Sequence, residues 1–206
     1  MDKLIYLNAV SGAKPALLKN VEINDEAQKL KQKLVSEFCR LSNCDPKDVE
    51  LNQNITTQIT FIIECIKKID PQFKVMISSH EIIYLEEFLK KGQVITDNIS
   101  YSNYVKAAGR SFPKTKVEIF EPGKFAQNPR KFILGKTIIV LSHISRLTGE
   151  LFPIEKIYKK IKQHSSESIF IVDGAQFTGS NFFDITNCCD AYITTTSKFI
   201  GGERHL

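Results

Sequence analysis

Polar residues that could carry chemistry follow directly after apolar runs of the chain. Asp173 comes after Ile-Phe-Ile-Val, and Lys198 comes after a run of hydroxyl residues and before Phe-Ile-Gly-Gly. An acid in such a place can hold a cation or a metal ion, or it can cap the following turn. A lysine near apolar walls can attack a carbonyl, whereas most loop lysines are solvated surface. Both alternatives stay open for each residue.

Two further segments have the composition of phosphate-binding loops. Asn54-Ile55-Thr56-Thr57 precedes an apolar helix, so its hydroxyls and the free N–H groups of the helix start could bind an anion or serve only as an N-cap. Gly135-Lys136-Thr137 resembles the end of a P-loop, but Arg130 stands where the earlier glycine is required. Gly-x-Gly-x-x-Gly is also absent from the sequence. A nucleotide-binding protein is therefore a weak interpretation.

Strands alternating with helices must position these residues. Apolar periodicity and strand composition predict four helices (Asp25–Leu41, Thr56–Ile69, Glu81–Lys91 and Pro153–Gln163) and five strands (Phe73–Ser78, Lys116–Phe120, Lys136–Ser142, Ser168–Asp173 and Asp190–Thr195). This alternation predicts an α/β domain with a mostly parallel sheet. Several strands are apolar without alternation, which indicates that both faces of the sheet are covered. Ligands of such sheets bind at the carboxyl ends of the strands.

Composition excludes several classes of protein. The 206 residues are 42% hydrophobic and 25% charged, which is typical of a single globular domain. The chain has no apolar run long enough to span a bilayer and no signal-peptide core, and its net charge of +5 is too scattered to indicate a nucleic-acid surface. Five cysteines without a Cys-x-x-Cys pair favour a reducing compartment, hence the cytoplasm. A zinc site formed by Cys188, Cys189 and the four scattered histidines is the alternative use of two of them.

Taken in order, the motifs resemble the class V aminotransferases, a family that depends on pyridoxal phosphate and includes the cysteine desulfurases. Val-Asp-Gly-Ala-Gln at 172–176, followed by Thr-Ser-Lys-Phe-Ile-Gly-Gly at 196–202, carries the resemblance most directly. The segments 5–9, 54–57 and 142–149 are similar to the family's opening segment, phosphate turn and Ser-His-x-Ser-x-x-Thr-Gly element. The resemblance covers residues 1 to about 202.

The resemblance implies the large domain of fold type I, a three-layer α/β structure with a mostly parallel sheet over residues 1–206. It also implies that this domain is incomplete at its C-terminus, because the family continues with another strand and a small domain. That part usually supplies the arginine that binds the substrate carboxylate and, in desulfurases, the catalytic cysteine. Family members are typically homodimers with sites at the subunit interface.

The resemblance also implies roles around the cofactor ring. Lys198 would form the Schiff base with the aldehyde of pyridoxal phosphate, and Asp173 would pair with the pyridine nitrogen so that the ring accepts electrons. Gln176 would donate a hydrogen bond to the phenolic oxygen, with Ser145 close to that oxygen. Ala175 would pack on one face of the ring.

The phosphate end of the cofactor has its own set of expected residues. Ile55, Thr56 and Thr57 would hold the phosphate through backbone and hydroxyl groups, and Thr195 and Ser197 would complete its surroundings.

Two positions depart from the family pattern. Ser197 stands before the lysine where the family commonly has histidine. Ile82 stands where an aromatic ring or histidine is expected to stack on the cofactor, so His80 would take that role through a small shift.

The sequence thus predicts a pyridoxal-phosphate-dependent protein that acts on a small amino acid or amine, without a metal, a membrane or a nucleic acid as partner. The alternative is a remnant or interaction protein that keeps the domain and has no catalytic activity.

Overall fold

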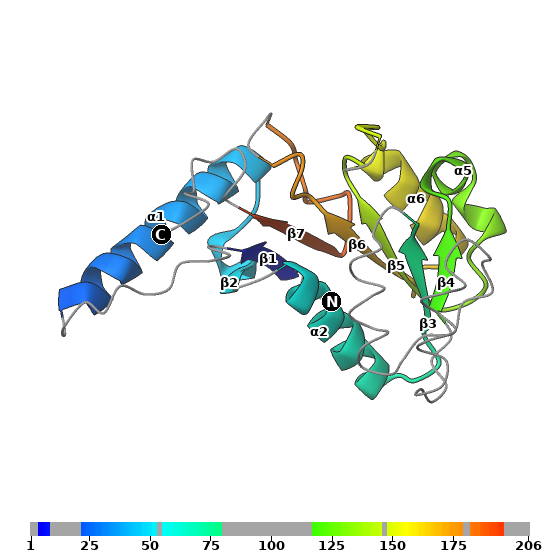
Figure 1. Ribbon diagram of the computed structural model, residues 1–206, viewed down its shortest axis with the longest axis horizontal. Coiled ribbons are helices and arrows are strands. Elements are labelled where there is room, and N and C mark those ends of the chain that lie inside the picture. Colours follow the sequence, from blue (N-terminus) through cyan, green and yellow to red (C-terminus); the bar gives the residue numbers. More distant parts are fainter. Residues whose placement is uncertain are drawn as a thin grey trace.

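Seven parallel strands form one sheet that runs through the molecule (Figure 1). The computed structural model describes residues 4–8, 22–52, 55–79, 117–145, 148–178 and 182–195. The strand order is β2-β1-β7-β6-β5-β3-β4, and every pairing is parallel. The strands are β1 (Leu4–Asn8), β2 (Val49–Asn52), β3 (Lys74–Ser78), β4 (Val117–Phe120), β5 (Thr137–Ser142), β6 (Ile169–Asp173) and β7 (Ala191–Thr195).

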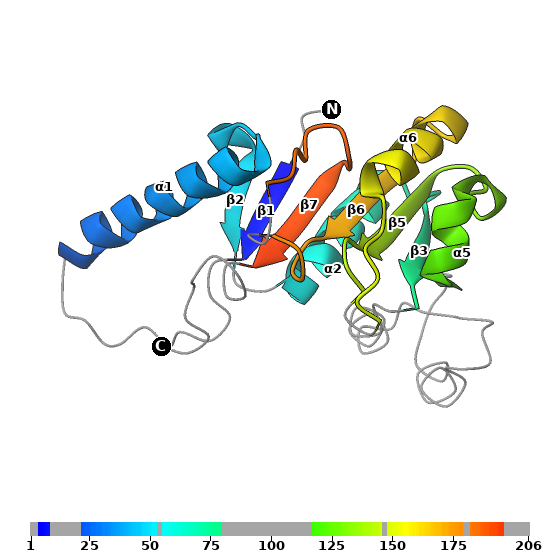
Figure 2. The same ribbon diagram turned by 90° about the horizontal axis from the view of Figure 1, so that it is seen from above.

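Helices cover both faces of this sheet. They are α1 (Glu22–Ser42), α2 (Ile55–Ile69), α5 (Pro122–Gln127) and α6 (Ile154–His164), with short 3-10 turns at Pro46–Asp48 and Pro129–Lys131. Figures 1 and 2 show α1, α5 and α6 on one face and α2 on the other. The predicted three-layer α/β architecture with a parallel sheet is therefore confirmed. No helix in the described part of the chain is long and apolar enough to cross a lipid bilayer.

The three central strands β5, β6 and β7 are buried along their whole length. Side chains of a strand alternate between the two faces of its sheet. Phe170, Val172 and Tyr192 accordingly pack with α6, whereas Ile171 and Ile193 pack with α2. Both faces are apolar, which explains why the sequence of these strands lacks polar alternation.

Helix α6 follows from the spacing of its isoleucines. Ile154, Ile157 and Ile161 are buried and recur at helical intervals, so they form one stripe against the sheet. On the exposed side, Lys159 Nζ lies 2.7 Å from Glu155 Oε1, one turn earlier. The helix thus has the apolar face that its sequence predicts.

Most predicted elements are confirmed, with ends shifted by a few residues. Three elements were missed, namely β1, β2 and α5. The prediction of a helix over Glu81–Lys91 lies outside the described residues.

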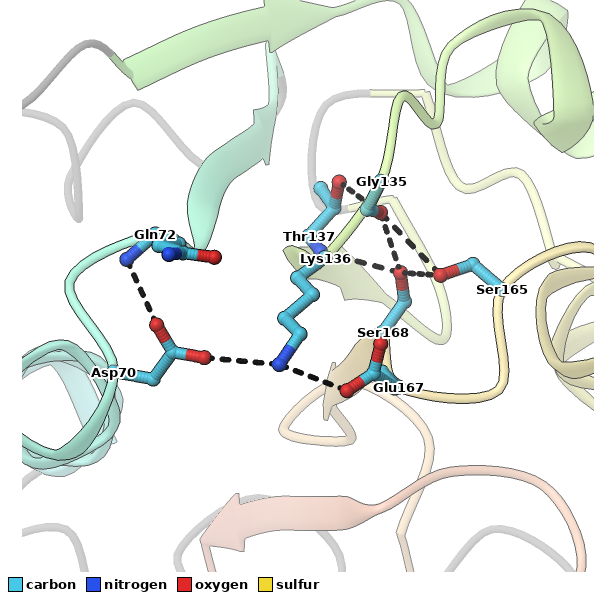
Figure 3. A network of polar contacts seen from close by, with 8 residues as sticks. All are labelled: Asp70, Gln72, Gly135, Lys136, Thr137, Ser165, Glu167 and Ser168. Carbon is cyan, nitrogen blue, oxygen red and sulfur yellow. Dashed lines mark hydrogen bonds and ion pairs between the residues drawn. The ribbon is translucent and has the colours of Figure 1, made fainter.

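A polar network ties the elements together at the amino edge of the sheet (Figure 3). Lys136 Nζ lies 3.1 Å from an oxygen of Asp70, which follows α2, and 2.8 Å from an oxygen of Glu167, which precedes β6. Ser168 is fully buried, and its hydroxyl donates to Ser165 Oγ at 2.8 Å and accepts from the N–H of Thr137 at 3.2 Å. The hydroxyl also lies 3.2 Å from the carbonyl oxygen of Gly135. The network thereby joins the starts of β5 and β6.

Replacing Ser168 with alanine should destabilise the fold. The substitution removes a buried hydroxyl and leaves the Thr137 N–H without this acceptor, which costs about 1–3 kcal/mol of unfolding free energy. Urea unfolding followed by circular dichroism measures the loss. Ser166→Ala at an exposed neighbouring position is the matched control and should change stability by less than about 0.5 kcal/mol. Equal stability of both variants would contradict this role of Ser168.

Candidate functional site

Three adjacent central strands each end in a polar residue. Ser142 of β5 pairs in register with Asp173 of β6, which pairs with Ile193 of β7, and Thr195 ends β7. Ser142, Asp173 and Thr195 expose only 4%, 8% and 5% of their surface. Because all strands are parallel, these buried polar side chains lie at one edge of the sheet.

This group of strand-end residues faces α2. Asp173 and Thr195 are each two residues beyond a residue packed against α2, Ile171 and Ile193, and strand side chains repeat with a period of two. Helix α2 itself begins at Ile55, shortly after β2 ends at Asn52. The start of α2 therefore lies at the same carboxyl edge, and a helix start carries free N–H groups and a positive partial charge.

Asp173 organises the turn that follows β6. Its Oδ1 accepts a hydrogen bond from the N–H of Ala175 at 2.8 Å, and both residues are buried. The carbonyl of Gly174 then accepts from the N–H groups of Phe177 and Thr178. Asp173 therefore caps the following turn, which is one of the two roles expected from the sequence. This hydrogen bond holds its carboxylate at the carboxyl edge of the sheet. Gln176 lies half-buried in this turn.

Ser145 lies in a tight turn beyond β5. Its side-chain oxygen accepts from the N–H of Thr148 at 3.1 Å, and its carbonyl accepts from the N–H of Gly149 at 2.8 Å. Gly149 has φ +74°, a conformation that favours glycine. The Ser145 side chain, 1% exposed, therefore has a local structural role in addition to any contact with a ligand.

The structure brings together part of the predicted cofactor site. Asp173, Ala175 and Thr195 lie at the carboxyl edge. There the first turn of α2 also lies, with half-buried Ile55 and with Thr56 and Thr57. The predictions for His80, Ser197 and Lys198 lie outside the described residues.

His143 belongs to the opposite face of the sheet, which sequence reasoning did not anticipate. Its ring stacks on Phe177 at 3.8 Å between centroids, and its Nδ1 lies 3.0 Å from Tyr192 Oη. The ring of Phe183 lies on a second side of the imidazole, with 4.4 Å between the ring centroids. Burial lowers the pKa of His143 to about 4, so the ring is neutral in the folded protein at pH 7.

A pocket of about 300 Å³ lies over this ring cluster and is lined mostly by apolar side chains. Glu155 and Lys156 are its charged lining residues. Because His143 stacks with aromatic rings, its imidazole serves packing on this face rather than the chemistry of the carboxyl edge.

Gly174 allows the close approach of the two central strands. A Cβ atom at this position would meet the ring of Tyr192 well inside van der Waals contact. The Gly174 N–H also donates to the carbonyl of Ile193 at 2.7 Å. Only glycine fits between the end of β6 and this ring, which explains the glycine after Asp173 by packing alone.

The zinc site considered for Cys188 and Cys189 has no further ligands among the described residues. The two buried Sγ atoms lie 3.6 Å apart, and Cys188 Sγ lies 3.3 Å from the carbonyl oxygen of Ile185. No group of three or more His, Cys, Asp or Glu side chains in the described ranges could hold a metal ion.

Comparisons with known proteins agree with the predicted resemblance. Residues 104–203 match the family described as aminotransferase class-V. Comparison with curated protein sequences gives no match. The family comparison therefore confirms the resemblance to the class V family over residues 104–203, which include the segments around Asp173 and Lys198.

Solved structures share the fold of the chain. A cystine C–S lyase in complex with its reaction product cysteine persulfide superposes with a TM-score of 0.58 at 18% identity, over 90% of this chain and 47% of that chain. A NifS-like protein gives a TM-score of 0.55 at 12% identity, over 81% of this chain and 43% of that chain. The chain thus spans less than half the length of these two structures, and the likeness concerns the fold.

The buried neutral His143 predicts an acid-sensitive stability. Because its pKa is about 4 in the folded state and about 6.5 when unfolded, the unfolded state binds more protons between these values. The unfolding free energy should be undiminished above about pH 6.5 and fall as the pH drops toward 4, by up to about 3 kcal/mol.

Urea unfolding of the wild type and of His143→Phe from pH 7 to pH 4.5 measures this dependence. The variant lacks the titrating group, so its stability should fall less steeply over the range. Ser166→Ala, at an exposed position without a titratable group, is the control and should keep the wild-type slope. Parallel curves for the wild type and His143→Phe would show that His143 does not titrate on unfolding.

Proposed function

Because residues 104–203 match the aminotransferase class-V family, we propose that the chain binds pyridoxal phosphate and contributes to the conversion of a small amino acid or amine. The observation that carries the proposal is the buried polar group at the carboxyl edge, with Asp173 facing the start of α2. A helix start suits a phosphate, and a carboxylate suits a protonated ring nitrogen. Both features lie at one edge of the sheet, where ligands of parallel sheets bind.

The residues present fit the cofactor in their chemistry. Ser142, Asp173 and Thr195 are polar yet at least nine-tenths buried, and they gather where ligands of parallel sheets bind. A carboxylate and two hydroxyls at this edge can pair with the ring nitrogen and the polar substituents of pyridoxal phosphate.

We assign the roles within this site as follows. Asp173 holds the proton on the ring nitrogen, while the Ala175 N–H keeps the carboxylate in place. The N–H groups at the start of α2, with Thr56 and Thr57, bind the phosphate. Ser145, Gln176, Thr195, Ser197 and His80 complete the surroundings of the cofactor, and Lys198 is the residue that binds it covalently. When bound, pyridoxal phosphate supplies a ring that accepts electrons from the reacting carbon of an amino acid.

We also propose a homodimer, by the same family resemblance, and a place in the cytoplasm, because the five cysteines suit a reducing compartment. The proposal concerns binding of the cofactor by this chain, and it extends to the full reaction only together with groups that recognise the substrate carboxylate.

Lys198 should be the one lysine that becomes covalently labelled. Incubation with pyridoxal phosphate followed by borohydride should attach a pyridoxyl group to Lys198, which peptide mapping by mass spectrometry detects. Lys198→Ala should abolish the labelling, whereas Lys159→Ala, on the exposed side of α6, should leave it intact. Labelling scattered over surface lysines and unchanged in Lys198→Ala would contradict the assignment.

Asp173 should contribute to cofactor affinity through its charge. Asp173→Asn keeps an oxygen that can accept from the Ala175 N–H but removes the charge that holds the ring proton. A charge-assisted hydrogen bond contributes about 1.5–3 kcal/mol, so cofactor affinity should drop roughly tenfold or more. Titration of each variant with pyridoxal phosphate, followed by absorbance, measures this change.

The exposed Asp184→Asn is the matched control for the charge change and should bind as the wild type does. Unaltered affinity in Asp173→Asn would show that Asp173 only caps its turn. Asp173→Ala should lower both the affinity and the thermal stability, because it also removes the acceptor for the Ala175 N–H.

A further inference from the structure

Two buried polar side-chain atoms in the described part of the chain have no hydrogen-bond partner, Gln58 Oε1 and Thr194 Oγ1. Gln58 exposes 8% of its surface, and Thr194 is fully buried. A buried polar group without a partner costs stability, so each of these atoms needs an explanation.

Thr194 is explained by its strand. It lies two residues after Tyr192 in β7, and Tyr192 packs in the cluster with α6, so Thr194 faces the same side. This is the face away from α2 and from Asp173. Thr194 thus supplies a β-branched side chain to a buried strand, on the face opposite to the candidate site.

Gln58 has a different position. It lies in the first turns of α2, three residues after Ile55 and four before Ile62, both of which pack with the cluster under the helix. It therefore lies at the border of the inward face of α2. Side chains of an α-helix tilt toward the helix N-terminus, so the amide of Gln58 is directed to the start of α2.

The start of α2 lies at the carboxyl edge of the sheet, on the side that Asp173 and Thr195 face. An amide without a partner there can serve a ligand. The two ends of the amide have nearly the same shape, and turning it by half a rotation exchanges the oxygen for an NH₂ donor. Because Oε1 has no partner, this turn breaks no hydrogen bond of the oxygen.

We propose that Gln58 is a cofactor-binding residue whose side-chain amide donates a hydrogen bond to the phosphate group held at the start of α2. The proposal rests on the proposed binding of pyridoxal phosphate. It adds a neutral donor to the N–H groups of the helix start, which share the same anion. When no ligand is bound, the Gln58 amide lacks this partner. The unfolding free energy is then lower than it would be with an apolar residue at position 58.

The proposal is tested by two measurements, in which a substitution of Gln58 should raise the stability of the free protein and lower its affinity for the cofactor. Gln58→Met keeps the length of the side chain and removes the polar amide, and Thr194→Val does the same for the hydroxyl on the opposite face. Both variants should unfold at higher urea concentration than the wild type when no ligand is present. Gln58→Met alone should bind pyridoxal phosphate about tenfold more weakly, whereas Thr194→Val should stay within about twofold of the wild type.

Pyridoxal, which lacks the phosphate, identifies the contacted group. Gln58→Met should leave the affinity for pyridoxal within about twofold of the wild type. Wild-type affinity of Gln58→Met for pyridoxal phosphate would overturn the proposal, as would an equal loss for both compounds. If the wild type binds neither compound, the proposed function fails. If the wild type binds and Asp173→Asn weakens binding while Gln58→Met does not, only the role of Gln58 fails.

Discussion

The parallel direction of all seven strands is the constraint on which the rest of the structure depends. Every strand must be followed by a crossing segment before the next one, and among the described residues α1, α2, α5 and α6 each lie in such a crossing, whereas the crossing from β6 to β7 has no helix. The central strands are therefore mostly apolar on both sides, and their charged residue, Asp173, stands at the end of β6. The amino edge holds Lys136 and Ser168 in a closed network, whereas the carboxyl edge gathers Ser142, Asp173 and Thr195.

The two faces of the sheet differ at the ends of the central strands. On the face of α6, Tyr192 packs against the rings around His143, and burial raises the pKa of Tyr192 well above its usual value while it lowers that of His143. Both groups are thus held neutral. On the face of α2, the strand ends point to the start of a helix. Gly174 directly follows Asp173 and lies against the ring of Tyr192 on the other face. It has no side chain, so the ring can approach its backbone closely.

Much of this arrangement could be predicted from the sequence, and the exceptions have physical causes. The strands β5, β6 and β7 and the helix α6 carry long apolar patterns that determine their type. Strand β2 has only four residues, and Glu50 within it is exposed, so its pattern is too short and too polar to recognise. Helix α5 has only six residues and begins with Pro-Gly, which is typical of a turn. The carboxylate of Glu121 accepts hydrogen bonds from two N–H groups at its start. Asp173 and Thr195 were predictable as strand ends. The packing of His143 could not be predicted. Neighbouring residues of a strand point to opposite faces of the sheet, so an error of one residue in the strand end would place His143 on the wrong face.

A fold of this kind is shared by proteins with different chemistries, so the proposed function rests on the site rather than on the superposition. The decisive residue is Asp173, because a carboxylate that is more than nine-tenths buried loses much of its hydration. The Ala175 N–H donates a hydrogen bond that offsets part of that loss. In the proposed complex, a protonated ring nitrogen would bring an opposite charge as well as a hydrogen bond, and the attraction between the two charges is stronger away from water. Under the proposed function, the burial of Asp173 would thus strengthen its attraction to a cationic ring.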